Sequence, residues 1–141
     1  MEEKKEILSI KDMLNVEAGK LEELPESEVK VEKFSELLGK DVYVKVRGIK
    51  SRRYEKLVTP AVENSAKNYD AKVHVAAEAI VEPDMHDKEL QKHFGARTPH
   101  ELVEILFPGE DLTRIFVETG RLSGFIKQDG EESDLEDEAK N

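Results

Sequence analysis

The chain has 141 residues, contains no cysteine and carries a formal net charge of −10 at pH 7. A chain of this length is expected to fold as one compact domain, and without cysteine it has no disulfide, thiolate metal ligand or thiol nucleophile. The acidic balance disfavours general binding to nucleic acid or to anionic membranes, because both depend on attraction between basic side chains and phosphate.

Residues 1–28 are predicted to form a loosely attached N-terminal arm. The apolar residues between Ile7 and Val16 suffice for one or two amphipathic turns, whereas Gly19 and Pro25 argue against a long helix. The first residues, Met1–Glu6, are charged and lack the apolar stretch of a secretory signal. No apolar run approaches the roughly 18 residues that a membrane span requires. We therefore expect a cytoplasmic protein.

Two short segments alternate between apolar and polar residues, as half-buried strands do. They are Glu28–Phe34 and Asp41–Ile49. Ser35–Gly39 lies between them and is predicted to form a single helical turn, closed by Gly39 in the left-handed conformation. Because the connection is short, the two strands are expected to pair antiparallel.

Helical periodicity dominates from Ser51 onward. Ser51 is expected to cap a helix that Pro60 interrupts. At Pro60 the helix either kinks, or it ends near Leu57 and restarts. A further helix is predicted over Ala71–Val81, with Asp70 as its N-cap.

Residues 83–125 carry the clearest signals for where helices begin and end. Asp84 precedes a short helix that Gly95 ends, and Thr98–Glu101 is a capping box with proline at the first helical position. Pro108-Gly109 ends that second helix, and a third follows. The connections are so short that successive helices must pack as neighbours.

Together these segments predict an α+β fold that is mostly α-helical, with a small antiparallel β element packed on four to five short helices. Residues 29–126 are expected to form the single compact domain. Residues 127–141 are expected to be a disordered acidic tail, since Asp129–Asn141 contains seven acidic residues and one basic residue, a net charge of −6. Such a composition buries too little apolar surface to offset the entropy of ordering.

Residues that could carry out chemistry are sparse. His86 and His93 are seven residues apart, whereas metal-binding pairs on helices are usually separated by three or four. Ser51, Ser65 and Ser123 lack the glycine-flanked context of a hydrolase nucleophile. We therefore predict a non-enzymatic protein with no catalytic residue, no metal and no cofactor.

A basic cluster extends from the second predicted strand into the following helix. No acidic residue separates its members, which are Lys45, Arg47, Lys50, Arg52 and Arg53. The cluster is either a solvated strand face that discourages edge pairing, or a contact for an acidic partner, for nucleic acid or for the chain's own acidic tail. Nucleic acid is the least favoured of these because of the overall negative charge.

The ordered series of caps and apolar anchors from Glu82 to Phe125 resembles one known family. Phe94-Gly95, Thr98-Pro99, Pro108-Gly109 and Gly124-Phe125 all stand in the order seen in XkdN-like tail assembly chaperones of phages and defective prophages of Gram-positive bacteria. The similarity extends upstream and covers about residues 12–125.

The resemblance implies a role in tail morphogenesis rather than a reaction. Proteins of this family hold the long helical tape measure protein until tail tube subunits polymerise around it, and they generally do not remain in the virion. The expected partners are therefore the tape measure protein and the tail tube protein, but not nucleic acid or membrane, while self-association is left open. Two alternatives stay open: a connector-like or terminator-like component retained in the particle, and a small regulatory module that binds nucleic acid.

We expect the partner to bind the apolar faces of two consecutive helices, rimmed by basic residues. A chaperone that holds an apolar client needs an exposed apolar surface, and a helix laid in a groove is a common mode of recognition. The apolar candidates are Leu102, Val103, Leu106, Leu112, Ile115 and Phe116, and the rim candidates are Lys45, Arg47, Arg52 and Arg53.

Overall fold

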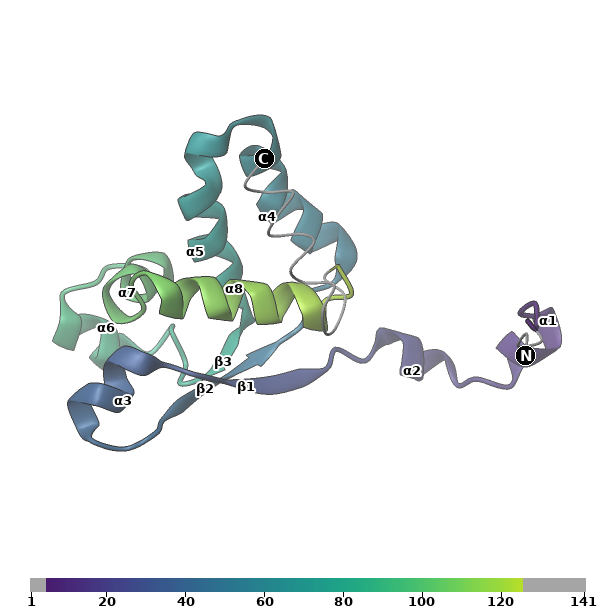
Figure 1. The fold of residues 1–141 in the computed structure, drawn as a ribbon, viewed down its shortest axis with the longest axis horizontal. Helices are drawn as coiled ribbons and strands as arrows, with labels where there is room; N and C mark the ends of the chain where they lie inside the picture. The colour runs from purple at the N-terminus through teal and green to yellow at the C-terminus, as the bar shows by residue number, and fades with distance from the viewer. Residues whose placement is uncertain (1–4, 126–141) are drawn as a thin grey trace.

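The computed structural model describes residues 5–125 (Figure 1), so the predicted acidic tail at 127–141 lies outside the described residues. Within that range the elements follow one another as α1 (Ile10–Leu14), α2 (Ala18–Glu22), β1 (Glu26–Lys30), α3 (Glu32–Leu38), β2 (Tyr43–Arg47), α4 (Ser51–Glu63), a 3₁₀ turn η1 (Ser65–Lys67), α5 (Asn68–Ala79), β3 (Ile80–Glu82), α6 (Lys88–Phe94), α7 (Pro99–Leu106) and α8 (Glu110–Leu122).

The strands form one antiparallel sheet in the order β1-β2-β3. Val29 of β1 lies opposite Val44 of β2, and Val46 of β2 lies opposite Ile80 of β3. The side chains of these four residues are buried, whereas Tyr43 and Arg47 on the other face of β2 are exposed. The alternation read from the sequence and the antiparallel pairing of the first two strands are therefore confirmed.

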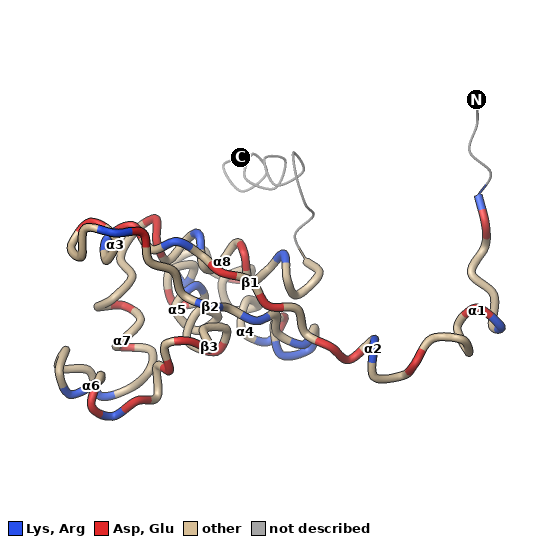
Figure 2. Tube along the Cα trace, turned by 90° about the horizontal axis from the view of Figure 1, so that it is seen from below, with Lys and Arg blue, Asp and Glu red and all other residues tan. Residues whose placement is uncertain are grey.

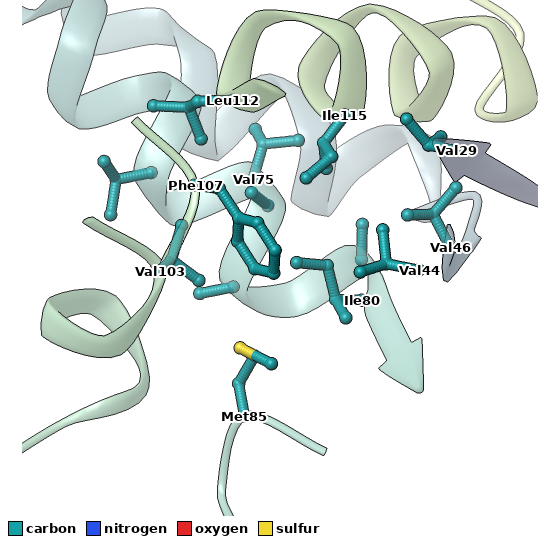
Figure 3. Packing of buried hydrophobic residues seen from close by; sticks show 14 of the residues in the cluster. Val29, Val44, Val46, Val75, Ile80, Met85, Val103, Phe107, Leu112 and Ile115 are labelled. Atoms are coloured by element: carbon teal, nitrogen blue, oxygen red, sulfur yellow. The ribbon is translucent and has the colours of Figure 1, made fainter. Parts of the chain in front are cut away.

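Helix α8 crosses the sheet and packs against β1, β2 and α5, while α5 also packs against α4 and α7 (Figure 1). The core lies between these layers, and its side chains point toward one another in Figure 3. Its largest fully buried members include Met85, Leu102, Phe107, Leu112 and Ile115. The predicted fold class, mostly α-helical with a small antiparallel sheet, is confirmed.

Several element boundaries differ from those predicted. The first strand ends at Lys30, so Phe34 belongs to α3 rather than to a strand. Ile80 and Val81 were expected to end a helix, but Ile80–Glu82 form the third strand because β2 offers them a partner. Helix α5 begins at Asn68, after η1, so Asp70 lies inside the helix and does not cap it.

Helix α4 runs from Ser51 to Glu63 with Pro60 inside it, so of the two alternatives the end near Leu57 with a restart is wrong, and the helix continues through Pro60. The hydroxyl of Thr59, next to Pro60, donates to the carbonyl of Glu55 (2.6 Å), four residues earlier on the same helix. The N-cap position is held by Lys50, so Ser51 is the first helical residue.

The residues that cap α3, α6 and α7 lie at or near the predicted positions. Gly39 and Gly95 have positive φ angles of 70° and 75° and end their helices as expected. The N-cap of α6 is Asp87 rather than Asp84. Thr98 accepts the N–H of Glu101 (3.1 Å), whereas the Glu101 carboxylate accepts the N–H of Arg97 (2.6 Å), one residue earlier than a capping box requires.

One buried carboxylate connects the beginning of α8 with the beginning of α3. Asp111 accepts the backbone N–H groups of Glu32 (2.8 Å) and Lys33 (3.1 Å) and forms an ion pair with Arg114. Its side chain is 4% exposed. The two N–H groups have no partner within α3 because they lie in its first turn, so a distant residue supplies the cap.

Replacing Asp111 with alanine should lower the free energy of unfolding by about 2–3 kcal/mol, because two backbone donors and a cation would lose a buried acceptor. Urea denaturation followed by circular dichroism measures this change. The matched control is Glu110→Ala, which removes an exposed carboxylate from the preceding position and should change stability by no more than about 0.5 kcal/mol. Equal midpoints for the two variants would contradict the capping role.

Candidate functional site

An apolar groove lies at the end of the sheet where β1 leads into α3. It has a volume of about 210 Å³. Its walls come from α3, the start of β2, the segment after β3, α6 and the end of α7. The residues that line it are Val31, Phe34, Leu38, Val42, Tyr43, Val44, Pro83, Leu90, Phe94, Leu106 and Phe107.

The groove has a buried floor and an exposed mouth. Val44 and Phe107 on the floor are core residues. At the mouth, Leu38 is 57% exposed and Tyr43 is 54% exposed. The floor is therefore fixed by the packing of the domain, while apolar side chains at the mouth remain open to a partner.

Two buried polar residues fix the walls. The hydroxyl of Ser35 in α3 accepts the backbone N–H of Val42 (2.9 Å), which fastens α3 to the residues entering β2. The side-chain amide of Gln91 in α6 donates to the carbonyl of Met85 (2.8 Å). Because both polar groups are satisfied away from solvent, they hold the walls in place without interrupting the apolar lining.

The border of the groove on the α6 side is acidic. A neighbouring depression shares Pro83 and Leu90 with the groove and is also lined by Asp84, Asp87 and Glu89. Figure 2 shows acidic positions in red where the chain approaches and enters α6. A partner that fills the groove therefore meets negative charge on this side.

The structure places most of the apolar residues proposed from the sequence inside the core. Five of the six have relative exposures of 4% or less: Leu102, Val103, Leu106, Leu112 and Ile115. Phe116 is partly buried and packs against the same cluster. Of this set, Leu106 alone also lines the groove. A partner cannot reach the buried five over most of their surface while the domain is folded as described.

The basic residues proposed as a rim do not encircle the groove. Arg47 pairs with Glu26 (2.8 Å), and Arg53 pairs with Glu78. Lys45 lies 3.6 Å from Glu82, in a depression next to the groove that also includes Tyr43. Arg52 is exposed on α4 and has no ion pair among residues 5–125. Three of the four charges are thus matched by carboxylates of the same chain.

The sequence-based prediction of the site missed the residues at the mouth of the groove. The doublet Leu37-Leu38, just before Gly39, indicated a helical turn but not its exposure. Tyr43 lies on the outer face of its strand, as its alternation with Val42 and Val44 indicates. The signal that could have found the groove was this accumulation of large apolar residues on positions that the strand and helix patterns place outside.

The other polar clusters of the described chain do not form a metal site. The rings of His74 and His100 lie 4.5 Å apart, between α5 and α7. Burial lowers the pKa of His100, and the neighbouring His74 lowers it further. No group of three or more histidine, aspartate or glutamate side chains within residues 5–125 is placed to hold a metal ion. None of the helices in this range is long and apolar enough to cross a membrane.

The structure thus defines a small α+β protein with an apolar groove on its surface. Residues 10–140 match the family described as phage XkdN-like tail assembly chaperone protein, and the chain belongs to that family. The resemblance noted from the sequence is confirmed. The crystal structure of the protein YqbN is similar at 23% sequence identity, over 71% of this chain and 87% of YqbN, with a TM-score of 0.49. No curated protein matches the chain.

A charge placed in the core should unfold the domain, whereas a charge at the mouth of the groove should leave it folded. Val103→Asp buries an unpaired carboxylate at a position with 0% exposure and should unfold the domain, since such a charge costs several kcal/mol. Leu38→Asp changes a half-exposed side chain and should leave the far-UV circular dichroism spectrum and the cooperative urea transition intact. A cooperatively folded Val103→Asp protein would contradict the described core.

Proposed function

We propose that this chain is a non-enzymatic chaperone that binds the tape measure protein and promotes assembly of the tail tube, acting in the host cytoplasm. Its membership of the tail assembly chaperone family supports a role in tail assembly. The observation that carries the choice of mechanism is the apolar groove with its exposed mouth at Leu38 and Tyr43. In this proposal the groove receives apolar side chains from a helix of the tape measure protein.

The dimensions of the groove favour anchor side chains over a small-molecule ligand. Its volume of about 210 Å³ is below the roughly 300–1,000 Å³ that is usual for small-molecule sites. An amphipathic helix needs less, because only its residues at one face enter the groove while the rest of the helix stays outside. The exposed apolar residue Leu37 beside the mouth extends the area available to such a helix.

Charge supports the same role. The net charge of −10 favours solubility of a chain that carries exposed apolar residues. The acidic border formed by Asp84, Asp87 and Glu89 favours client helices with basic residues next to their apolar face. Because Lys45, Arg47 and Arg53 pair with carboxylates, little unpaired positive charge is left in this region to attract nucleic acid.

Leu38→Asp should weaken binding to purified tape measure fragments at least tenfold, which corresponds to about 1.4 kcal/mol, because a carboxylate would face the apolar lining. Isothermal titration calorimetry or a quantitative pull-down measures the change. Val62→Asp is the matched control: it places the same charge on an exposed apolar residue of α4 that does not line the groove. Equal affinities of Leu38→Asp and wild type would refute the groove as the client site.

Mass spectrometry of purified phage particles should detect no peptides of this chain, whereas peptides should be abundant in lysates during assembly. A chaperone leaves when the tube has enclosed the tape measure protein. Stoichiometric retention in the particle would instead support a structural component such as a connector or terminator. The tail tube protein, detected in the same particles, serves as the positive control.

A further inference from the structure

The first turns of helix α4 carry positive charge that no carboxylate of the described chain matches. Residues 50–56 contain four basic residues and one acidic residue. One of the four pairs with Glu78 of α5. The other three, Lys50, Arg52 and Lys56, are exposed and have no ion pair within the described part of the chain; they are called the basic patch below. Figure 2 shows blue positions gathered around the labels of β2 and α4.

The beginning of a helix is an unfavourable place for these charges. The N-terminus of a helix carries a partial positive charge, so it repels basic side chains in the first turn. The first turn of α4 contains no acidic residue, and the side chain of its N-cap residue, Lys50, makes no capping hydrogen bond. Negative charge supplied from elsewhere would offset this repulsion.

The last described residues of the chain are fastened to the same end of α4. The ring of Phe125 stacks on the ring of Tyr54, with the ring centroids 4.6 Å apart and the planes at 14°. The hydroxyl of Ser123 accepts the backbone N–H of Ile49 (2.8 Å), in the connection from β2 to α4. The residues that follow Phe125 therefore leave the domain beside the first turns of α4.

The close approach of α8 to this connection requires a residue without a side chain. A Cβ atom at Gly48 would lie 2.6 Å from the backbone oxygen of Leu122, far inside van der Waals contact. The packing of α8 against the segment that leads into α4 therefore fixes the point at which the C-terminal residues leave the domain.

The residues that follow carry the opposite charge. Residues 129–141, called the acidic segment below, lie outside the described residues and contain seven acidic residues and one basic residue, a net charge of −6. Asp129 is four residues after Phe125, and four residues span up to about 13 Å. This reach exceeds the roughly 10–12 Å diameter of a helix with its side chains. Arg52 and Lys56, one turn apart on α4, are therefore within reach of the acidic segment.

We propose that the acidic segment binds the basic patch of its own chain and covers it against other polyanions. A tethered segment acts at a high effective concentration, so ion pairs that are individually weak at a surface suffice for this contact at low ionic strength. Nucleic acid gains affinity with each phosphate that is neutralised, and three cations give it little when the acidic segment is already bound to them. The contact lies outside the groove and is independent of the client site.

Paramagnetic relaxation enhancement in the full chain tests the contact. The chain contains no cysteine, so Ser133→Cys supplies a single site for a nitroxide label within the acidic segment. The label should weaken the amide signals of Arg52 and Lys56 about twofold at low ionic strength, where exposed charges are least screened. The signals of Lys88 and Lys92 in α6 should keep their intensity. Salt at about 0.5 M should remove most of the loss, because it screens exposed charges.

Charge variants separate an ionic contact from mere proximity to α4. Replacing the seven acidic residues of the acidic segment with their amides keeps the tether at Phe125 and should abolish the salt-dependent loss of signal. Arg52→Gln/Lys56→Gln should do the same. The matched control Lys88→Gln/Lys92→Gln removes two exposed lysines of the same spacing from α6 and should change nothing. Equal signal loss in the amide variant and in wild type would overturn the proposal. Circular dichroism of each variant verifies that it is folded.

A mixed sample identifies the chain to which the bound segment belongs. Nitroxide-labelled chain without isotope is mixed with isotope-labelled chain without nitroxide, so that only contacts between copies weaken the amide signals. The basic patch should keep its full intensity in this mixture. A loss equal to that in the singly labelled chain would show that the segment binds a second copy and would overturn the contact within one chain.

Heparin affinity chromatography tests whether the acidic segment covers the basic patch. The amide variant should elute at higher salt than wild type, because its patch is uncovered. Adding Arg52→Gln/Lys56→Gln to the amide variant should reverse most of this shift, whereas adding Lys88→Gln/Lys92→Gln should reverse little of it. If both pairs of changes reverse the shift equally, overall charge accounts for heparin binding and the patch is not what the segment covers.

Discussion

The buried carboxylate of Asp111 is the interaction on which the arrangement of this domain depends most. It lies in the first turn of α8, where the helix dipole favours a negative charge, and it caps the first turn of α3. One side chain therefore fixes the helix that crosses the sheet relative to the helix that forms a wall of the groove. The position of the groove wall therefore depends on the same contacts that hold the core together.

The same residue explains why parts of the fold could be predicted from the sequence and others could not. Gly39 and Gly95 end helices through their own backbone preference, and Thr98 caps the helix that follows it by accepting the N–H three residues ahead. Such signals depend on residues that are close to one another in the sequence, so they can be predicted from it. The start of α3 depends on Asp111, which is 79 residues from Glu32. No local pattern carries that information, and the strand was accordingly extended too far.

The third strand was missed for a related reason. Ile80 continues the apolar spacing of α5, and periodicity alone does not separate the end of a helix from a short buried strand. Ile80 becomes part of a strand because the backbone of β2 pairs with it at Val46. Tertiary pairing therefore overrides a local preference that is weak in so short a segment.

The candidate site was harder to predict than the fold, because an amphipathic pattern says which side chains avoid water but not what covers them. In α7, Leu102 and Val103 are covered by the chain itself. At the mouth of the groove and in the arm, residues such as Leu38 and Leu14 are left open. The distinction depends on how much of each helix face the rest of the fold can reach, and only the assembled structure gives it.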